Sequence, residues 1–324
     1  MSHEFIDSNI RGNRVQSALL ILGMACLLSL MGYLIGGTLG LVIAVVVCLL
    51  ALVFGPRVSP QIVLRMYKTQ PISRATSPEL FDMFQELVRR AELDVAPSLH
   101  YVPSRTLNAF AVGHADNAAV AITDGLLRIL NPREIAGVLA HELSHIRHRD
   151  MWVLGIADSV SRITATLSQI GQFMLLFALP LSIAGGGYVF LISALVLVFA
   201  PLISNLMQLA LSRSREFNAD LGAVRITKDA IGLSSALSKL ERATSSDAGA
   251  PWIFAGRRRT TVPAMLRTHP PTDQRIERIM EAGRSIGQQF PIGENQVPAR
   301  RRVQMQQHPR VRSGPRWHVA GLWY

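Results

Sequence analysis

Cysteine and charge are both scarce in this sequence. Its 324 residues include two cysteines, Cys26 and Cys48, both inside apolar stretches. This excludes a disulfide-stapled fold and a cysteine-rich metal cluster. Charged residues make up 17% of the chain, against about 25% in an ordinary soluble domain, while 49% of the residues are hydrophobic. A disordered chain would show the opposite balance, so the composition indicates a membrane protein.

Two stretches of the chain contain no charged residue at all. They run over residues 15–56 and 163–212, which is 42 and 50 residues. About 20 apolar residues cross a hydrocarbon core as a helix, so each stretch is long enough for two crossings joined by a turn. We expect the turns at Gly36–Gly37 and at Gly185–Gly187. The sequence therefore predicts four transmembrane helices.

Basic residues stand at both ends of each stretch, at Arg14 and Arg57 and at Arg162 and Arg213. The two hairpin tips carry no charge. Because lysine and arginine accumulate on the cytoplasmic side of a membrane, we expect the N-terminus, the C-terminus and the segments between the hairpins to be cytoplasmic.

The segments outside the two stretches have the patterns of a folded domain. Residues 57–162 mix α and β signals, with strand-like runs at 99–102, 109–112 and 119–122. The last two runs are separated by residues that favour a turn, which predicts a β-hairpin. Residues 213–243 and 272–282 have the periodicity of helices.

One helix in the first soluble segment carries metal-binding chemistry. Residues 131–134 predict its start, with an N-cap asparagine, a proline and an acid that completes a capping box, and we expect it to run to about Asp150. On it stand His141, Glu142 and His145, in the pattern His-Glu-x-x-His. Residues at i and i+4 share a helix face. Two imidazoles can therefore bind one zinc ion while Glu142 reaches a water molecule from the side.

A catalytic zinc site needs a third protein ligand and an open position for water. His148 lies on the same helix face, but about 10 Å of helical rise from His141 is too far for one ion. Glu216, which we expect to begin a helix after the second stretch, is the better candidate and pairs with Asp220 at i+4. One carboxylate can bind the metal while the other orients a ligand histidine. The spacing is equally compatible with Glu216 as an acid that only favours a helix N-terminus.

Taken together, these motifs resemble the HtpX-type membrane zinc peptidases, which are related to the CAAX prenyl endopeptidases. The matching elements are His-Glu-Leu-Ser-His at 141–145, Ser-Arg-Ser-Arg-Glu-Phe-Asn-Ala-Asp at 212–220, Leu-Asn-Ala-Phe-Ala at 107–111, and Thr-His-Pro-Pro at 268–271 followed by 273–276. The alternation of hairpins and soluble segments matches as well. The resemblance covers the chain to about residue 280.

The resemblance implies a mainly α integral membrane protein with a cytoplasmic α+β zinc-metallopeptidase domain. It implies one zinc ion per chain, bound by His141, His145 and Glu216, with Glu142 as the catalytic base. It also suggests that Asp220 orients a ligand and that His269 stabilises the oxyanion. The residues that would flank the substrate are Asn108, Ala109 and Phe110.

The pattern of charge and hydrophobicity predicts the layout of the chain, and the resemblance implies its partners. The expected parts are the N-terminal segment with the first hairpin (1–56), the first protease segment (57–162), the second hairpin (163–212), the second protease segment (213–282) and a basic tail (283–324). The implied partners are the lipid bilayer of a bacterial-type plasma membrane and membrane-protein or unfolded polypeptide substrates. The implied role is protein quality control and stress response.

Other functions are compatible with parts of this pattern. A CAAX-type endopeptidase for prenylated proteins would use the same chemistry, and a non-catalytic membrane scaffold could keep the zinc ligands, although the intact Glu142 argues against a scaffold. Charged flanks such as Arg133 and Asp150 argue against an intramembrane protease. Residues 213–324 hold 19 Lys and Arg against 9 Asp and Glu. No nucleic-acid-reading pattern accompanies that charge, so we expect no nucleic-acid partner.

Overall fold

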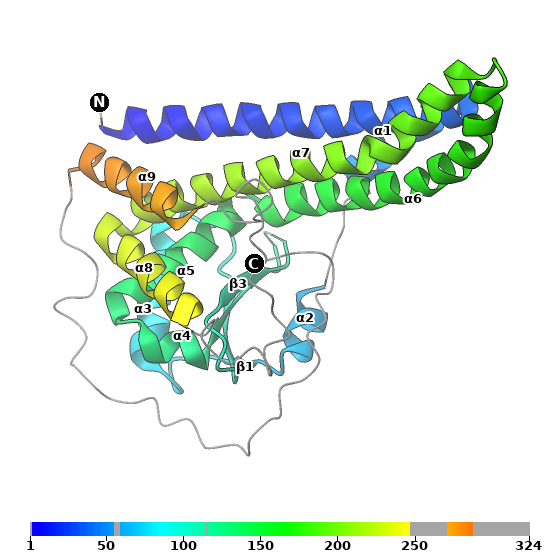
Figure 1. The fold of residues 1–324 in the computed structure, drawn as a ribbon. Coiled ribbons are helices and arrows are strands. Elements are labelled where there is room, and N and C mark those ends of the chain that lie inside the picture. The colour runs from blue at the N-terminus through cyan, green and yellow to red at the C-terminus, as the bar shows by residue number, and fades with distance from the viewer. Residues whose placement is uncertain (1, 55–58, 115, 247–270, 288–324) are drawn as a thin grey trace.

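The structure is a computed structural model that describes residues 2–54, 59–114, 116–246 and 271–287 (Figure 1). A bundle of long helices projects from a domain of shorter helices and one sheet. The helices are α1 (Ser2–Phe54), α2 (Pro60–Met66), α3 (Pro78–Arg90), α4 (Asp124–Ile129), α5 (Pro132–Arg147), α6 (Asp150–Ile183), α7 (Tyr188–Thr227), α8 (Ala230–Ser246) and α9 (Thr272–Ser285). The strands are β1 (Gln70–Pro71), β2 (Ser98–Val102), β3 (Ala109–Val112) and β4 (Ala119–Thr123).

Three helices of the described chain, α1, α6 and α7, are long and apolar enough to cross a membrane. The first of them is bent, because Gly36 and Gly37 leave the helical conformation, Gly37 with a φ of 59°. The second half of α1 folds back along the first, so that the backbones of Gly32 and Gly40 meet and Ala44 lies beside Gly32. The other two helices pack along each other and are joined by a turn at residues 184–187 (Figure 1). Both turns lie at the glycines that predicted them.

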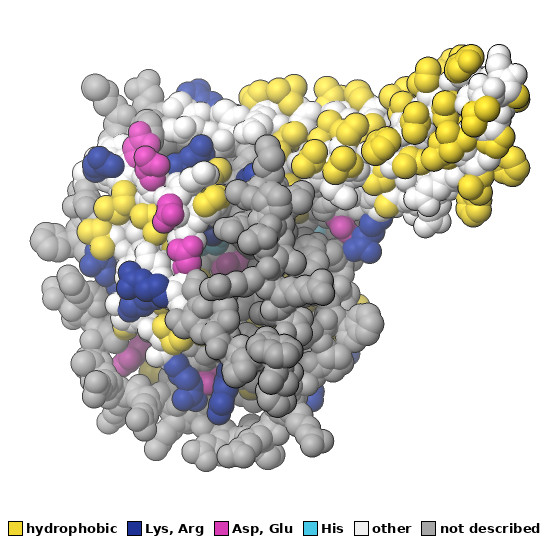
Figure 2. Space-filling view, in the orientation of Figure 1, with side chains coloured by type: hydrophobic (Ala, Val, Ile, Leu, Met, Phe, Trp, Pro, Cys, Tyr) yellow, Lys and Arg dark blue, Asp and Glu magenta, His cyan; other side chains and the backbone are white. Residues whose placement is uncertain are grey.

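The outward surface of these helices is apolar, as expected for contact with lipid. Figure 2 shows hydrophobic side chains over the projecting part of the bundle. Leu39 is 69% exposed and Phe177 is 71% exposed, a degree of apolar exposure that calls for a nonaqueous surrounding. Between α6 and α7, Gly171 lies against Leu197. Close packing through small residues is typical of helices in membranes.

The domain beside the bundle contains a four-stranded sheet in the order β1-β2-β4-β3. The predicted hairpin is present, since β3 and β4 pair antiparallel with Phe110 opposite Ala121. Strand β2 runs parallel to β4, with Leu99 opposite Val120. Strand β3 is an edge strand among the described strands, and α5 packs against it.

Helix α5 is the structural centre of this domain. Residues 134–146 are all buried, and α3, α7, α8 and β3 pack around the helix. Leu139 and Leu143 are completely inaccessible to solvent, and a buried leucine stabilises the fold by about 1.5–3 kcal/mol. A helix enclosed in this way is a rigid support for the side chains that it carries.

Two expectations about helix ends are corrected by the structure. Helix α5 ends at Arg147 and does not reach Asp150, because Arg149 adopts a left-handed conformation with a φ of 55° that turns the chain. Asp150 instead begins α6, which continues unbroken into the bundle. Glu216 does not begin a helix, because α7 runs without a break to Thr227. The membrane helices therefore extend directly into the domain.

Candidate metal centre

The first turn of α5 fixes the positions of the histidines that follow. Asn131 Oδ1 accepts a hydrogen bond from the backbone N–H of Glu134 at 2.9 Å, and Glu134 Oε2 accepts one from the backbone N–H of Asn131 at 2.8 Å. This is the predicted capping box. Two turns later, His141 and His145 share one face with their ring centroids 4.7 Å apart. Both side chains are buried.

Three potential ligands converge at this face of α5. His141, His145 and Glu216 each offer one atom, and these atoms all lie within 4.8 Å of one another. The two Nε2 atoms are 3.1 Å apart, and oxygens of Glu216 lie 3.6 Å and 3.8 Å from them. Ligands held by one tetrahedral zinc ion at about 2.0–2.1 Å are about 3.3–3.5 Å from each other. The donor types and their spacing therefore fit one divalent cation.

His141 is supported by a carboxylate that is itself held by an arginine. Asp220 Oδ1 lies 3.1 Å from His141 Nδ1. Arg275 of α9 donates two hydrogen bonds to Asp220, of 2.8 Å and 2.7 Å, and its Nη1 lies 3.3 Å from Glu216. Burial lowers the pKa of Arg275, but the charges of Asp220 and Glu216 raise it more. The guanidinium therefore stays charged and holds both carboxylates of α7.

His145 has a second support of the same kind. Its Nδ1 lies 2.8 Å from Asp150 Oδ2, and Arg215 Nη1 donates to Asp150 Oδ1 at 3.1 Å. Burial lowers the pKa of His145, but Asp150 and the carboxylates of Glu216 and Glu142 raise it to about 9. Asp150 thus stabilises positive charge on this imidazole. Because Nδ1 is hydrogen-bonded to a carboxylate, Nε2 is directed to the point where His141, His145 and Glu216 converge.

Glu142 lies next to His141 on α5 and reaches the edge of the sheet. Its side chain is buried, and its carboxylate accepts a hydrogen bond from the backbone N–H of Ala111 in β3. Its Oε2 atom has no hydrogen-bond partner among the described residues. Burial raises the pKa of Glu142, and the neighbouring histidines offset part of that rise. A carboxylate with a raised pKa beside a group of potential metal ligands is suited to accept and return a proton.

The chain is similar to known proteins over most of its length. Residues 74–282 match peptidase family M48. A protein named Protease HtpX homolog from Salinibacter ruber is 38% identical over 285 residues, which cover 84% of this chain and 99% of that protein. Proteins of the same name from Burkholderia mallei and Burkholderia pseudomallei are 34% identical over 293 residues, which cover 84% of this chain and 98% of theirs.

The chain belongs to the HtpX-type proteases of peptidase family M48. The family resemblance inferred from the motifs is therefore confirmed. With the group of His141, His145 and Glu216 and with three helices long enough to cross a bilayer, the chain is a membrane-bound metalloprotease.

The residues predicted to flank the substrate lie at and just before β3. Asn108 precedes the strand, and its backbone N–H and C=O are both bonded to the Thr123 hydroxyl. Ala109 begins the strand. The Phe110 ring packs on the α2 side of the sheet, 5.0 Å from the ring of Tyr67. The backbone of β3, through Ala111, is therefore the part that meets the metal centre, and His269 lies outside the described residues.

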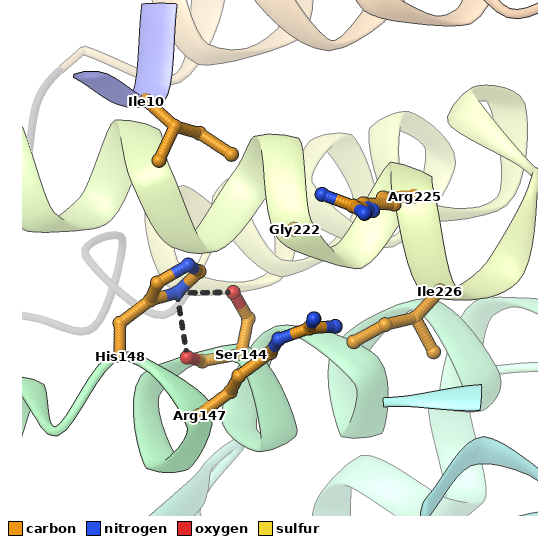
Figure 3. Close-up of a pocket in the computed structure, with 7 residues that line it drawn as sticks. All are labelled: Ile10, Ser144, Arg147, His148, Gly222, Arg225 and Ile226. Atoms are coloured by element: carbon orange, nitrogen blue, oxygen red, sulfur yellow. Dashed lines mark hydrogen bonds between the residues drawn. The ribbon is translucent and has the colours of Figure 1, made fainter. Parts of the chain in front are cut away.

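Helices α5 and α7 cross where Ser144 meets Gly222. A Cβ on Gly222 would overlap Ser144 Oγ and would lie 2.9 Å from Ser144 Cβ. Only glycine lets the two helices approach this closely, and this approach brings Glu216 to the histidines. Beside the crossing, His148 turns away from the metal group, with its Nδ1 2.9 Å from the carbonyl oxygen of Ser144. The small pocket at this place is shown in Figure 3 and is lined by Ile10, Ser144, Arg147, His148, Gly222, Arg225 and Ile226.

Four residues of the centre were missed by the reasoning from sequence. Asp150, Arg215 and Arg275 complete the two histidine supports, and Gly222 permits the helix crossing. A local signal existed for two of them, because Asp150 follows His145 by five residues and Gly222 follows Asp220 by two. Both arginines lie in elements that carry the family resemblance, at 212–220 and 273–276, but local spacing did not indicate their roles because their partners lie far away in the sequence.

Proposed function

We propose that this metalloprotease is a zinc endopeptidase that hydrolyses peptide bonds of membrane proteins or of their cytoplasmic segments. The observation that carries the proposal is the convergence of His141, His145 and Glu216 on one point, with Glu142 beside it. Two imidazoles and one carboxylate form a ligand set of catalytic zinc sites, in which a fourth position stays open for water. We assign one zinc ion to each chain.

The chemistry divides between the metal and the side chains around it. A bound zinc ion supplies Lewis acidity, which lowers the pKa of water toward about 7 and polarises the scissile carbonyl. Glu142 takes the proton of the attacking water on its carboxylate and later delivers it to the leaving amine. Asp220 and Asp150 keep the two histidines oriented through their Nδ1 atoms. We assign to His269 a hydrogen bond to the oxyanion.

Strand β3 gives the substrate a place to bind. An extended peptide can add to the edge of a sheet through backbone hydrogen bonds. Strand β3 is an edge strand among the described strands, and its residues Ala109, Phe110 and Ala111 are buried. The backbone of Ala111 lies within hydrogen-bond reach of Glu142, so a peptide along this edge runs past the catalytic base. Asn108, Ala109 and Phe110 form the beginning of that edge and are assigned to the substrate site on this basis.

We assign four membrane crossings, two to each hairpin, and place both termini and the metal centre in the cytoplasm. The reversal of α1 at Gly36–Gly37 and the turn between α6 and α7 support two crossings each. Arginine flanks every crossing on the side of the domain, and the hairpin tips carry no charge. This distribution is that of cytoplasmic flanks.

The position of the centre relative to the membrane favours substrates held in the bilayer. Asp150 begins α6, and Glu216 lies within α7, four residues beyond the uncharged stretch that ends at Ser212. Four residues of helix rise about 6 Å, which places the centre near the headgroups. A protease at this height meets chains that emerge from the membrane, and quality control of membrane proteins is the role we propose.

The proposal is tested by comparing the wild-type protein with the Glu142→Gln variant in lipid vesicles. We expect the variant to retain one zinc ion per chain and to cleave a membrane-tethered substrate about 10²–10⁴ times more slowly. A chelator should abolish cleavage by the wild type, and added zinc should restore it. Wild-type rates from the variant would refute the role of Glu142, and cleavage by zinc-free protein would refute the metal. Comparing the cleavage of prenylated and unprenylated forms of one substrate distinguishes this activity from that of a CAAX-type endopeptidase.

A further inference from the structure

We infer that α2 is an interfacial helix, whose outer face lies in the headgroup layer of the bilayer at the membrane end of the domain. The helix spans Pro60–Met66 and is followed by Tyr67 and Lys68. It joins the first hairpin to the protease domain, and the metal centre does not use it. The occupant of its outer face is the anionic lipid surface.

The two faces of α2 differ in what they contact. Val63 and Leu64 point inward and pack against the cluster that contains Phe110. Ile62 and Met66, one helical turn apart, point outward and are 57% and 50% exposed. Large apolar side chains that recur at i and i+4 on an outer face mark a surface that contacts a nonaqueous partner.

The position of α2 in the chain places this face beside the membrane. Phe54 ends α1 and Pro60 begins α2, so only five residues lie between them, and the chain from Phe54 to Pro60 reaches at most about 20 Å. The last turn of α1 still belongs to the lipid-facing surface, because Val53 is 67% exposed. In Figure 1, α2 lies on the flank of the domain toward which the bundle projects, beyond the sheet. The outer face of α2 therefore lies within about 20 Å of the lipid-facing end of the first hairpin.

The side chains around this face match the chemistry of the headgroup layer. Arg65 and Lys68 are exposed next to Ile62 and Met66, and cationic side chains attract anionic lipids at this depth. Tyr67 is 48% exposed, and tyrosine is enriched at the boundary between lipid and water. Apolar residues mixed with lysine, arginine and tyrosine are the composition of helices that lie in a membrane surface.

The contact between Tyr67 and β3 gives this surface a consequence for catalysis, which rests on the proposed function. The Tyr67 ring packs against Phe110 in a tilted arrangement, with 5.0 Å between the ring centroids, so α2 is packed directly on the strand assigned to the substrate. An anchored α2 holds β3 at a fixed depth below the bilayer. The substrates it selects are segments that leave the membrane close to α2.

The depth of α2 can be measured without any assay of proteolysis. Single nitroxide labels are attached at Ile62→Cys, Met66→Cys and, as a control, Ile129→Cys, each in a Cys26→Ala, Cys48→Ala chain in phosphatidylglycerol and phosphatidylcholine vesicles. Ile129 is 42% exposed on α4, away from the projecting bundle (Figure 1). We expect labels at 62 and 66 to be relaxed by oxygen and shielded from a water-soluble nickel chelate. The label at 129 should show the reverse.

Two outcomes would overturn the inference. Labels at 62 and 66 that are as accessible to the nickel chelate as the label at 129 would show that α2 stands in water. Dipolar broadening between labels on different chains would show that a second copy of the protein covers the face. These measurements report only the depth of the labels in the bilayer. Their outcome therefore does not depend on the metal chemistry.

A kinetic comparison tests the consequence for substrate choice. The Ile62→Gln, Met66→Gln variant should cleave a membrane-tethered substrate about tenfold more slowly, since two partly exposed apolar side chains lose their contact with lipid. Its rate on a short soluble peptide and the rates of Ile129→Gln on both substrates should be unchanged. An equal loss on both substrates would show that α2 supports the fold and does not select the substrate. Failure of the wild type to cleave either substrate would count against the proposed function alone.

Discussion

Each histidine of the candidate metal centre lies beside a carboxylate, but the two carboxylates come from different parts of the chain. His145 contacts Asp150, five residues later, at the point where α6 begins. His141 contacts Asp220, which lies beyond the second hairpin, and Asp220 is held by Arg275 of α9. One half of the centre is therefore nearly local, whereas the other half exists only when α7 and α9 are packed on α5.

This difference shows what the inserted hairpin contributes. The α6–α7 hairpin separates the two halves of the centre in sequence and returns the chain so that Glu216 reaches the histidines. Helices α6 and α7 also pack along each other in the bundle. In the proposed zinc site, the distant half therefore depends on the packing of α7 against α5. Changes there should have larger effects than equivalent changes on the local half.

Removal of the ligand from the distant half should have the largest effect. In the Glu216→Ala variant we expect zinc content and proteolysis to fall to background, because two imidazoles alone leave the ion without its third protein ligand. Zinc is measured in the purified protein, and proteolysis is measured in vesicles. The matched control is Glu241→Ala, which removes an exposed acid on α8. Full zinc content in Glu216→Ala would mean that the third ligand is another residue.

The two carboxylate supports should differ in how much they strengthen metal binding. We expect Asp220→Asn to weaken zinc binding by about 100-fold and Asp150→Asn by about tenfold, the range found for residues that orient metal ligands. The reason for the difference is Arg275, whose Nη1 lies 3.3 Å from Glu216. Without the charge of Asp220, Arg275 competes with the metal for the carboxylate of Glu216. Titration with a competing chelator measures both affinities, and equal losses would show that Arg275 does not compete.

A third prediction concerns the crossing that joins the two halves. Gly222→Ala should destabilise the protein by about 1–3 kcal/mol, the usual range for overpacking, and should lower zinc affinity as α7 is pushed away from α5. Adding Ser144→Ala removes the hydroxyl that the new methyl group would overlap. The double variant should therefore recover part of both losses, as measured by thermal unfolding and zinc titration. Additive losses would show that the two residues do not meet.

The sequence predicted well those features that form within one helix, one hairpin or one turn. The capping box at Asn131 and Glu134 and the spacing of His141 and His145 depend on contacts within one helix. The β3–β4 hairpin and the glycine turns of the bundle were predictable for the same reason.

The distant half could be predicted only in part, because its contacts depend on tertiary packing. The left-handed conformation at Arg149 separates α5 from α6, and nothing in the local pattern distinguishes it from one longer helix. The charge pairs of Arg275 and Arg215 and the approach of Gly222 to Ser144 join residues on separate helices. The short helix α2 was missed because seven residues give too little periodicity to recognise.

The smallest expected effect lies at the start of α5, where the local half can be perturbed without touching the metal ligands. Glu134 is buried and accepts hydrogen bonds from Asn131, Ser235 and Lys239. Burial raises the pKa of Glu134, but these partners lower it more, so the net pKa lies below its ordinary value of 4.5. A carboxylate whose pKa is lower in the folded state stabilises the fold above its unfolded pKa. That contribution is lost as the pH falls through the folded pKa.

The Glu134→Gln variant should therefore be less stable than the wild type by about 1 kcal/mol at neutral pH, the size of a helix-cap contribution. The difference should shrink below the ordinary pKa and vanish once Glu134 of the wild type is protonated. Thermal unfolding of both proteins in the same detergent, at neutral and acidic pH, measures this difference. Glu79→Gln, which alters an exposed acid in the first turn of α3, is the matched control. The stability difference between Glu134→Gln and the wild type would contradict this account if it persisted unchanged in acid. That result would show that the charge of Glu134 does not stabilise α5 and that shape and packing alone hold the start of this helix in place.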